Sequence, residues 1–524
     1  MTSKEVHSTS RSFLYPSCHE QKEQTTTQSQ ILYSHSPVDN LEVNTLKIST
    51  NTSLSIDISP SVPIATAYAP IAAALFAYRT TLPDQPDSDQ NNIPRTKSNT
   101  AMPTALITGA TGMTGRAITD HLLSLPEWTS ITTLSRSQKS HCSDPKVHHA
   151  TLDLQSSAES MSSSLSDIKA EYVFFCAYLA RDDESEAAKV NGAMLQNFID
   201  ALRHTGAIKH LKRFVLVNGL KQWGVHLGRP KQPMHESDPR LEPSNNSPWP
   251  ENFYYTQQDI LAEAARKDGG NWTWVVTFPQ DVIGVAKANF MNLATALGLY
   301  ASVMATLPAH ELPFPGCKAN YLAFNCWTSA KLHADFCTWA ALEPKAGNQT
   351  FNVIDGDTES WQNLWPKVAK RYGAKIPANM FPGSGERGVD GAYDGYEASH
   401  TELPTPMPVS AVAEAIGLKD EFSEDKHSVI HQQIDTTKWA QRPEVVKAWE
   451  NLRDQHGLDQ QTWDKATWGF LTFLLGRDYS CVVSMGKARK LGWTGYKDTW
   501  DAFDETFAEL EKEGILPKAS ELRH

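Results

Sequence analysis

Cysteine is scarce in this sequence and carries no motif. The seven cysteines of the 524-residue chain are widely spaced, at Cys18, Cys142, Cys176, Cys317, Cys326, Cys337 and Cys481. No two of them stand in the CxxC spacing of zinc sites and redox motifs, and their number is odd. We therefore expect no disulfide framework, no metal site, and a reducing compartment, namely the cytoplasm.

Positive charge is also in short supply. The chain has 48 Lys and Arg against 60 Asp and Glu, a net charge of −12. Binding to nucleic acid draws on a basic face that neutralises phosphates. This excess of acidic residues argues against nucleic acid as a partner and favours a small molecule. It is compatible with a homodimer.

Long uninterrupted apolar runs are missing as well. The apolar stretch at residues 61–78 is broken by Pro63 and Pro70, so it is too short to span a bilayer. The uncharged stretch at residues 288–309 contains Asn292 and Pro308 among other polar positions, which are costly against lipid. We expect no stable membrane span.

The chain divides into a polar beginning and a patterned remainder. Residues 1–100 are rich in Ser, Thr, Gln, Asn and Pro, a composition typical of disorder. Residues 101–290 alternate short apolar runs with helical patterns and predict a dinucleotide-binding domain, which residues 320–357 rejoin. The Trp-rich residues 291–524 predict a smaller, mainly helical lobe that binds the substrate.

The predicted fold is α/β, a doubly wound parallel sheet of the Rossmann type. Strands are expected at residues 104–108, 131–134, 147–152, 172–177, 214–218, 272–277 and 350–355. Helices are expected at residues 113–125, 186–204 and 255–267.

A glycine motif connects the first strand to the first helix. Gly109, Gly112 and Gly115 form GxxGxxG, with Thr111 and Met113 between them. Such glycines allow a tight turn, a close approach of the backbone to a pyrophosphate and packing of the helix on the strand. The motif predicts dinucleotide binding.

The residues after the second and third strands bear on which dinucleotide is bound. NAD-selective enzymes carry an acid after the second strand, but this chain has Ser135 and Arg136 there. A hydroxyl and a guanidinium suit a 2′-phosphate, which favours NADPH. Asp153 follows the third strand, where it either meets the adenine or caps the next helix.

The usual catalytic Tyr-x-x-x-Lys of such reductases is absent. In the run NFYYTQQDILAE, Tyr255 stands where the catalytic tyrosine would be. Asp259 stands four residues later, where the lysine would be. Lys221, in VLVNGLKQW after the fifth strand, is the available replacement. A nearby ammonium lowers the pKa of a phenol and holds the cofactor ribose, so Tyr255 and Lys221 are candidates for the catalytic pair.

This rearrangement resembles the progesterone 5β-reductase and iridoid synthase-like enzymes, an atypical branch of the extended short-chain dehydrogenases/reductases. The likeness runs from about Thr104 onward and includes NFYY, NGLK, the NGAMLQN helix, FMNL, FPG and FNVIDGD. It implies NADPH-dependent reduction of the C=C bond of α,β-unsaturated carbonyl compounds in specialised metabolism. Hydride goes to the β-carbon, and the tyrosine stabilises the enolate.

The predicted site is therefore as follows. Tyr255 and Lys221 are catalytic, and Trp223, Phe253 and Met291 line the substrate pocket. The predicted cofactor residues are Gly109, Thr111, Gly112, Met113, Gly115, Ser135, Arg136, Asp153, Leu154, Ala177, Tyr178, Lys221, Tyr255, Pro279 and Val282.

This chain departs from the family pattern at the loop after the sixth strand and leaves other functions open. Phe278 precedes Pro279 where the family commonly has arginine, and Asn218-Gly219-Leu220 replaces Thr-Gly-Thr before the lysine. The alternatives are a carbonyl reductase or epimerase of the same superfamily, and a non-catalytic regulator that senses the dinucleotide.

Overall fold

The computed structural model describes residues 31–34, 44–48, 54–58, 102–138, 142–244, 247–287, 291–382 and 391–522. The chain divides into two compact units, Met1–Asn99 and Thr100–His524. In the first unit the described strands β1 (Ile31–Ser34), β2 (Asn44–Ile48) and β3 (Leu54–Ile58) form an antiparallel sheet. The rest of the predicted disordered segment lies outside the described residues.

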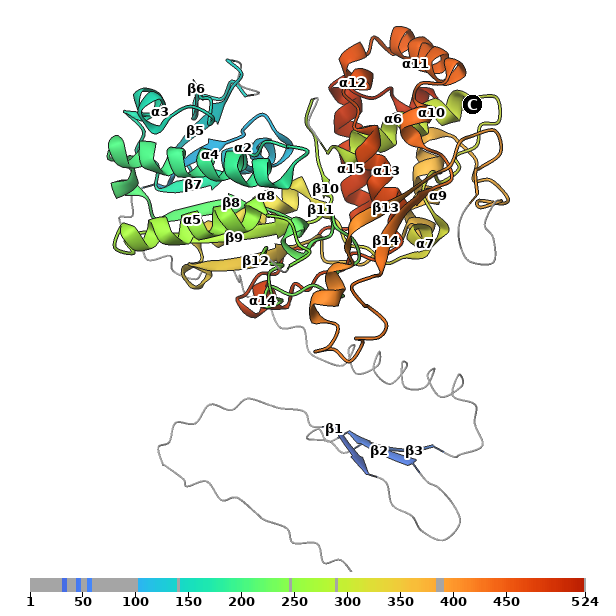
Figure 1. Ribbon diagram of the computed structural model, residues 1–524, viewed down its shortest axis with the longest axis horizontal. Coiled ribbons are helices and arrows are strands. Elements are labelled where there is room, and N and C mark those ends of the chain that lie inside the picture. Colours follow the sequence, from blue (N-terminus) through green and yellow to red (C-terminus); the bar gives the residue numbers. More distant parts are fainter. Residues whose placement is uncertain are drawn as a thin grey trace, which may run out of the picture. The chain divides into compact units, whose positions relative to one another are not determined.

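The second unit is built on a seven-stranded parallel sheet, which confirms the predicted fold class (Figure 1). Its strand order is β12-β9-β8-β7-β4-β5-β6, so the chain winds outward in both directions from β4. The strands are β4 (Thr104–Thr108), β5 (Ser130–Ser135), β6 (Val147–Thr151), β7 (Tyr172–Phe175), β8 (Arg213–Val217), β9 (Thr273–Pro279) and β12 (Gln349–Val353).

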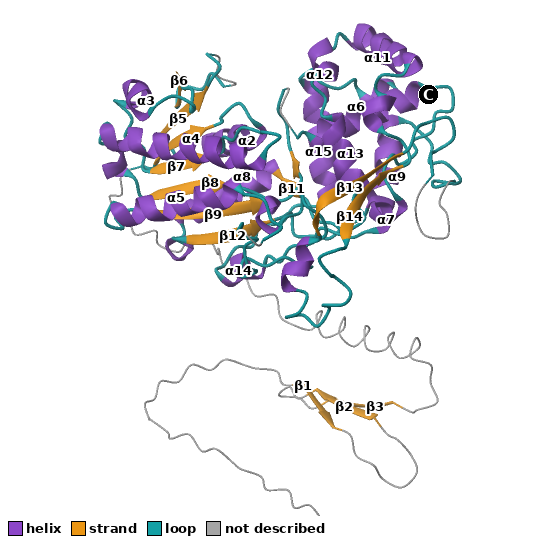
Figure 2. Cartoon of the chain, in the orientation of Figure 1, coloured by secondary structure: helices purple, strands orange, loops and turns teal. Residues whose placement is uncertain are grey.

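Helices cover both faces of this sheet (Figure 2). One layer contains α3 (Ala158–Leu165), α4 (Glu184–His204) and α5 (Phe253–Lys267), and the other contains α2 (Met113–Ser124) and α8 (Ala330–Leu342). Because neighbouring strands of the sheet are all parallel, their carboxyl ends lie at one edge.

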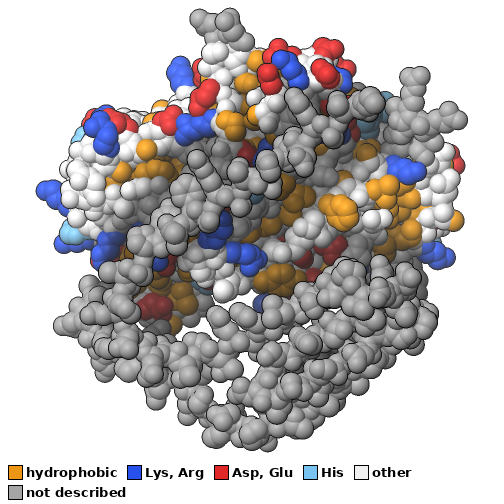
Figure 3. Space-filling model, turned by 90° about the horizontal axis from the view of Figure 1, so that it is seen from below, with side chains coloured by type: hydrophobic (Ala, Val, Ile, Leu, Met, Phe, Trp, Pro, Cys, Tyr) orange, Lys and Arg blue, Asp and Glu red, His pale blue; other side chains and the backbone are white. Residues whose placement is uncertain are grey.

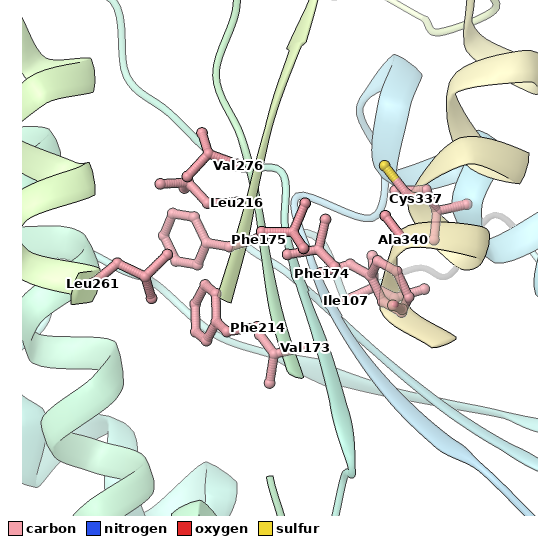
Figure 4. Packing of buried hydrophobic residues seen from close by; sticks show 14 of the residues in the cluster. Ile107, Val173, Phe174, Phe175, Phe214, Leu216, Leu261, Val276, Cys337 and Ala340 are labelled. Atoms are coloured by element: carbon pink, nitrogen blue, oxygen red, sulfur yellow. The ribbon is translucent and has the colours of Figure 1, made fainter. Parts of the chain in front are cut away.

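Alternating side chains of the strands fill the space on either side of the sheet. Figure 4 shows Phe175 and Phe214 pointing toward Leu261 of α5, while Phe174 points toward Cys337 of α8. The central strands are buried on both faces, with Phe174, Phe175 and Phe214 completely inaccessible to solvent. This packing makes the sheet a rigid support for the loops at its edge.

The C-terminal lobe has a second apolar core that is rich in tryptophan. Trp327, Trp361, Trp365, Trp439 and Trp449 are almost completely buried in or against it. Its helices are α6 (Leu293–Thr306), α7 (Lys318–Leu322), α9 (Trp361–Tyr372), α10 (Thr436–Trp439), α11 (Pro443–His456), α12 (Gln460–Asp464), α13 (Trp468–Gly476) and α15 (Thr499–Lys512). The short helix α14 (Gly486–Lys490) packs against β12 instead.

Two features of this lobe differ from the sequence-based expectation. It contains an antiparallel pair of strands, β13 (Ser399–Pro406) and β14 (His427–Gln432), which had not been predicted. Furthermore, Tyr479, Cys481 and Trp493 pack into the core of the sheet rather than into that of the lobe. The chain thus crosses back to the sheet near its end, because these apolar side chains are buried there.

The surface of the described residues carries charged and apolar side chains side by side. Acidic and basic side chains alternate with apolar ones on the face in Figure 3. No described helix has both the length and the apolar character needed to cross a membrane. Among the described residues, no group of three or more His, Cys, Asp and Glu is arranged to hold a metal ion.

Candidate active site

The glycine turn after β4 is held by two close approaches of the backbone. Gly109 has φ of +66°, and a Cβ there would lie 3.0 Å from the carbonyl carbon of Cys176, at the end of β7. A Cβ on Gly115 would lie 2.4 Å from the carbonyl oxygen of Gly109. Neither position accepts a side chain, since backbone atoms occupy the space.

The N-terminus of α2 is suited to an anion. Gly112 is its N-cap, and no described side chain caps the helix. Thr111 is exposed beside it, whereas Met113 is buried between Gly284 and Ala330. The first-turn N–H groups and the positive end of the helix dipole fit the pyrophosphate of a dinucleotide.

The loops after β5 and β6 lie next to this turn. The N–H of Ala110 donates to the carbonyl of Leu134, 3.3 Å away, and the N–H of Leu152 donates to that of Ser135, 2.9 Å away. Ser135 is buried and Arg136 is exposed, so the guanidinium is available to a ligand at this edge.

Asp153 and Leu154 follow β6. Leu154 is buried in the core, and exposed Asp153 accepts a hydrogen bond from the N–H of Gln155 at 3.0 Å. The alternative in which Asp153 caps the next helix is wrong, because Ser157 is the N-cap of α3 and accepts from the N–H of Ser160.

The loop after β7 carries Ala177 and Tyr178. Asn191 of α4 holds this loop, because its side chain accepts from the N–H of Leu179 at 2.7 Å and donates to the carbonyl of Leu179 at 2.8 Å. The ring of Tyr178 stacks on that of Phe253, with centroids 6.1 Å apart and planes within 9°. The two rings form an aromatic ledge at the sheet edge.

Lys221 lies in the segment after β8. Its Nζ donates to Oε1 of Glu184, the first residue of α4, over 2.7 Å, and lies 5.8 Å from the ring centroid of Phe253. Its main-chain carbonyl accepts from the side-chain amide of Asn252 at 2.7 Å. Because Asn252 is also the N-cap of α5, the start of that helix is fixed relative to the lysine.

The two adjacent tyrosines at the start of α5 face different surroundings. The hydroxyl of Tyr254 is 3.0 Å from the place a Cβ would take on Gly219, directly after β8 and near the carbonyl of Pro279. The hydroxyl of Tyr255 donates to the carbonyl of Gln222 at 2.6 Å and accepts from the N–H of Leu241 at 3.0 Å. Tyr254, rather than Tyr255, thus has its hydroxyl at the edge where the predicted cofactor loops meet.

Burial determines the protonation of both phenols. It raises the pKa of Tyr254 far above the ordinary value, and Tyr178 and Glu184 raise it further. Burial also raises the pKa of Tyr255, partly offset by the N–H of Leu241. Both side chains are therefore neutral hydrogen-bond donors near neutral pH.

The segment after β9 is tied to the C-terminal lobe. Pro279 ends β9, and Val282 in β10 (Val282–Ile283) pairs with Thr328 in β11 (Thr328–Ser329). Between them Asp281, with φ of +37°, forms a 2.8 Å ion pair with Arg477, whose side chain is only 3% exposed. This ion pair sets the course of the loop beside the cofactor edge.

The three predicted pocket residues are not gathered in one described cluster. Trp223 is buried and packs edge-on against Phe278, at 5.1 Å between ring centroids. Phe253 belongs to the aromatic ledge with Tyr178. Met291 is half-buried and has φ of +59°, just before the N-cap of α6.

A cavity of about 350 Å³ lies between α2, α8 and α15. Its walls include Met113, Arg116, Lys331 and Glu505. The two cations are engaged, Arg116 with Glu513 and Lys331 with Glu509 and Glu505. The cavity therefore adjoins the predicted cofactor site without containing its residues, apart from Met113.

Several residues that shape this edge were not predicted from the sequence. Asn191 could have been noticed as a polar residue in an otherwise apolar helical pattern. Glu184 lies in the polar run RDDESE and Arg477 follows a glycine, and neither position carries a local signal of its partner.

Fold and site together define an NAD(P)-dependent oxidoreductase of the short-chain dehydrogenase/reductase type, with the glycine turn, the loops of the parallel sheet and a half-buried tyrosine at one edge. The model of the PRISE-like Rossmann-fold domain matches residues 105–411, which is more than half of the chain. The chain therefore belongs to this family, as the sequence motifs had indicated.

Several relatives extend over most of the second unit. A protein of Schizosaccharomyces pombe is 37% identical over 419 residues, covering 79% of this chain and 98% of the relative. The short chain dehydrogenase gsfE of Penicillium aethiopicum is 30% identical, covering 79% and 99%. The 3-oxo-Delta(4,5)-steroid 5-beta-reductase of Arabidopsis thaliana is 32% identical, covering 51% and 69%.

Proposed function

We propose that this protein is an NADPH-dependent reductase that saturates the C=C bond of α,β-unsaturated carbonyl compounds, with Tyr254 as the catalytic tyrosine in place of Tyr255 and with Lys221 beside it. The observation that carries the proposal is the position of half-buried Tyr254, whose hydroxyl lies just beyond the end of β8, 3.0 Å from the place of a Cβ on Gly219. The name of the Arabidopsis relative describes such a reduction of an enone in a steroid.

The choice of cofactor rests on the residues of the glycine turn and of the β5 loop. The N–H groups at the start of α2 suit the pyrophosphate, and Gly109 and Gly115 keep the turn clear of side chains. The exposed guanidinium of Arg136 suits a 2′-phosphate, and no acid stands next to it after β5. When bound, NADPH supplies the hydride to the β-carbon of the substrate.

The protein's own groups act on the substrate oxygen. As hydride reaches the β-carbon, the electrons of the C=C bond move toward the carbonyl oxygen, which becomes an enolate. Neutral Tyr254 donates a hydrogen bond to that oxygen, and burial strengthens this bond relative to water. A proton from solvent on the α-carbon then completes the saturated carbonyl compound.

We also propose the compartment in which the reaction takes place and the class of its substrate. The buried thiols of Cys326, Cys337 and Cys481 form no disulfide, which fits a reducing compartment such as the cytoplasm. The exposed, aromatic Tyr178 beside Phe253 fits a hydrophobic enone from specialised metabolism.

The test measures NADPH consumption with a panel of cyclic and linear enones, with identification of the products. We expect saturated carbonyl compounds. Tyr254→Phe should reduce kcat by roughly 10²-fold, because one oxyanion donor is lost. Tyr255→Phe is the matched control and should affect kcat much less.

Three results would contradict the proposal. Allylic alcohols as products would identify a carbonyl reductase. Tight NADPH binding without turnover of any enone would identify a dinucleotide sensor. Equal losses in the two tyrosine variants would remove Tyr254 from its proposed role.

A further inference from the structure

Half-buried His149 of β6 lies beside the loop that carries Arg136. β6 is the edge strand next to β5, and the two strands run parallel with His149 opposite Thr133. Side chains two residues apart on a strand share a face, so Thr133 and Ser135 both lie on the side of the sheet that carries the imidazole. The ring is therefore placed at the end of β5, directly before the proposed contact with the 2′-phosphate.

Both nitrogens of this imidazole are engaged. Nε2 lies 2.9 Å from the carbonyl oxygen of Ser137, and Nδ1 lies 2.9 Å from the hydroxyl of Thr133. A carbonyl oxygen only accepts hydrogen bonds, so Nε2 carries a hydrogen and donates. In the neutral ring Nδ1 is then an acceptor, and the buried Thr133 hydroxyl donates to it. The ring thus braces the loop against β5.

Ser135 supports the same carbonyl group. Its hydroxyl donates to the carbonyl oxygen of Ser137 at 3.2 Å, and Nε2 of His149 lies 3.4 Å from that hydroxyl. A serine hydroxyl has one hydrogen to donate, and the oxygens of a phosphate dianion only accept. The Ser135 hydroxyl therefore holds the loop rather than the 2′-phosphate for which the sequence suggested it, and Arg136 is left as the side chain that meets this phosphate.

The main chain is held on both sides of Arg136. Before it, the carbonyl of Ser135 accepts from the N–H of Leu152 at 2.9 Å. After it, the carbonyl of Ser137 accepts from His149 at 2.9 Å. The exposed arginine side chain has many rotamers, so the place of its Cα decides which of them reach a ligand.

We propose that His149 is a positioning residue for recognition of the 2′-phosphate, because it fixes the main chain after Arg136 and so keeps the guanidinium within reach of that phosphate. The inference rests on the proposed function in its choice of NADPH over NADH. His149 itself contacts Thr133, Ser135 and Ser137 and acts through Arg136. A loop that is ordered before the cofactor arrives lowers the entropy that binding costs.

The test measures, by calorimetry on the full chain, the binding of 2′,5′-ADP and of 5′-AMP, which differ only in the 2′-phosphate. Wild type should bind 2′,5′-ADP more tightly. In His149→Asn the amide reaches the place of Nδ1 but not that of Nε2, so the hydrogen bond to Ser137 is lost. The affinity for 2′,5′-ADP should fall about three- to tenfold, and that for 5′-AMP should not change.

His149→Gln is the matched variant. Its amide N–H reaches the place of Nε2, so it should keep the contact with Ser137 and most of the wild-type affinity for 2′,5′-ADP. Exposed His148, the preceding residue of β6, provides the control His148→Ala. This control should bind both nucleotides as wild type does, because successive side chains of a strand point to opposite faces.

A double-mutant cycle tests whether His149 acts through Arg136. In the Arg136→Ala background, His149→Asn should have little further effect on the affinity for 2′,5′-ADP, because the guanidinium that His149 positions is absent. The same fold loss in both backgrounds would overturn the proposal.

Two further results would overturn it, namely a wild-type preference for 2′,5′-ADP in His149→Asn, or equal losses in His149→Asn and His149→Gln. If His149→Asn does not fold, Thr133→Val removes the brace at Nδ1 instead. It must also weaken 2′,5′-ADP binding alone, and no change would overturn the proposal.

Failure of the proposed function gives a different result. If wild type binds 2′,5′-ADP no more tightly than 5′-AMP, the choice of NADPH fails and the role of His149 fails with it. If wild type prefers 2′,5′-ADP but reduces no enone, only the proposed reaction fails, and the binding measurements still decide the role of His149.

Discussion

Tyr254 and Tyr255 are neighbours in α5, and a helix turns by about 100° per residue, so their hydroxyls leave the helix in different directions. Asn252 fixes the rotation of α5, because its side chain accepts from the N–H of Tyr254 at 3.0 Å and donates to the carbonyl of Lys221. One residue of rotation thus decides which phenol meets the sheet edge and which meets Gln222 and Leu241.

Arg136 is a second residue whose role follows from its surroundings. Its guanidinium is exposed after β5, next to the buried Ser135. In Arg136→Ala the preference for NADPH over NADH should narrow roughly tenfold, since a charge-assisted contact with the 2′-phosphate is lost. The ratio of the two kcat/KM values measures this.

The control for Arg136 is Arg266→Ala. Arg266 is exposed in the last turn of α5, where it pairs with Glu263. Its removal should leave the ratio unchanged. A ratio that is unaffected in Arg136→Ala would show that another group recognises the cofactor.

The turn from β4 into α2 is tightly constrained. It is pressed between the end of β7 and the first turn of its own helix, because Gly109 touches Cys176 and Gly115 touches Gly109. Thr119 strengthens α2 through a hydrogen bond from its hydroxyl to the carbonyl of Gly115 at 2.8 Å. The turn therefore keeps one shape, which suits a fixed pyrophosphate site.

Gly115→Ala tests this constraint. The added Cβ meets the carbonyl oxygen of Gly109, so the free energy of unfolding should fall by about 1–3 kcal/mol, as for overpacking. The affinity for NADPH should fall with it. Urea denaturation and the quenching of protein fluorescence on titration with NADPH measure the two effects.

Gly469→Ala is the matched control in α13. A Cβ there meets no atom within 4 Å, and its φ is not positive, so alanine should stabilise the helix by up to about 1 kcal/mol. NADPH affinity should not change. If Gly115→Ala keeps the wild-type stability and the wild-type affinity for NADPH, the turn can move to accommodate the added methyl group.

At the scale of the whole molecule, the second unit has two apolar cores of its own. One apolar core lies around the sheet and another in the C-terminal lobe. Arg116 and Lys331 of the sheet domain form ion pairs with Glu513 and with Glu505 and Glu509 at α15. The proposed site lies entirely within this unit.

A chain that begins at Met102 should therefore keep the kcat and cofactor affinity of the full chain. Its Tm should agree within roughly 2 °C, because both cores are retained. Thermal denaturation and the enone assay check this. A large fall in Tm or kcat would show that residues 1–101 contribute to the fold or to the site.

Local patterns in the sequence determined the strands of the doubly wound sheet and the glycine turn. Apolar runs of strand length, helical periodicity and the GxxGxxG spacing are each contained in a few consecutive residues, and β4 occupies the predicted residues 104–108. The same is true of Lys221 and Arg136, which follow recognisable strands.

Only the tertiary structure decided which side chains meet at the sheet edge. The contact of Lys221 with Glu184 joins residues 37 positions apart, and that of Asp281 with Arg477 joins residues 196 positions apart. The orientation of Tyr254 depends on a cap that reaches back to Lys221, 31 positions away from Asn252. Such contacts depend on how distant segments pack, and no pattern along the chain encodes them separately.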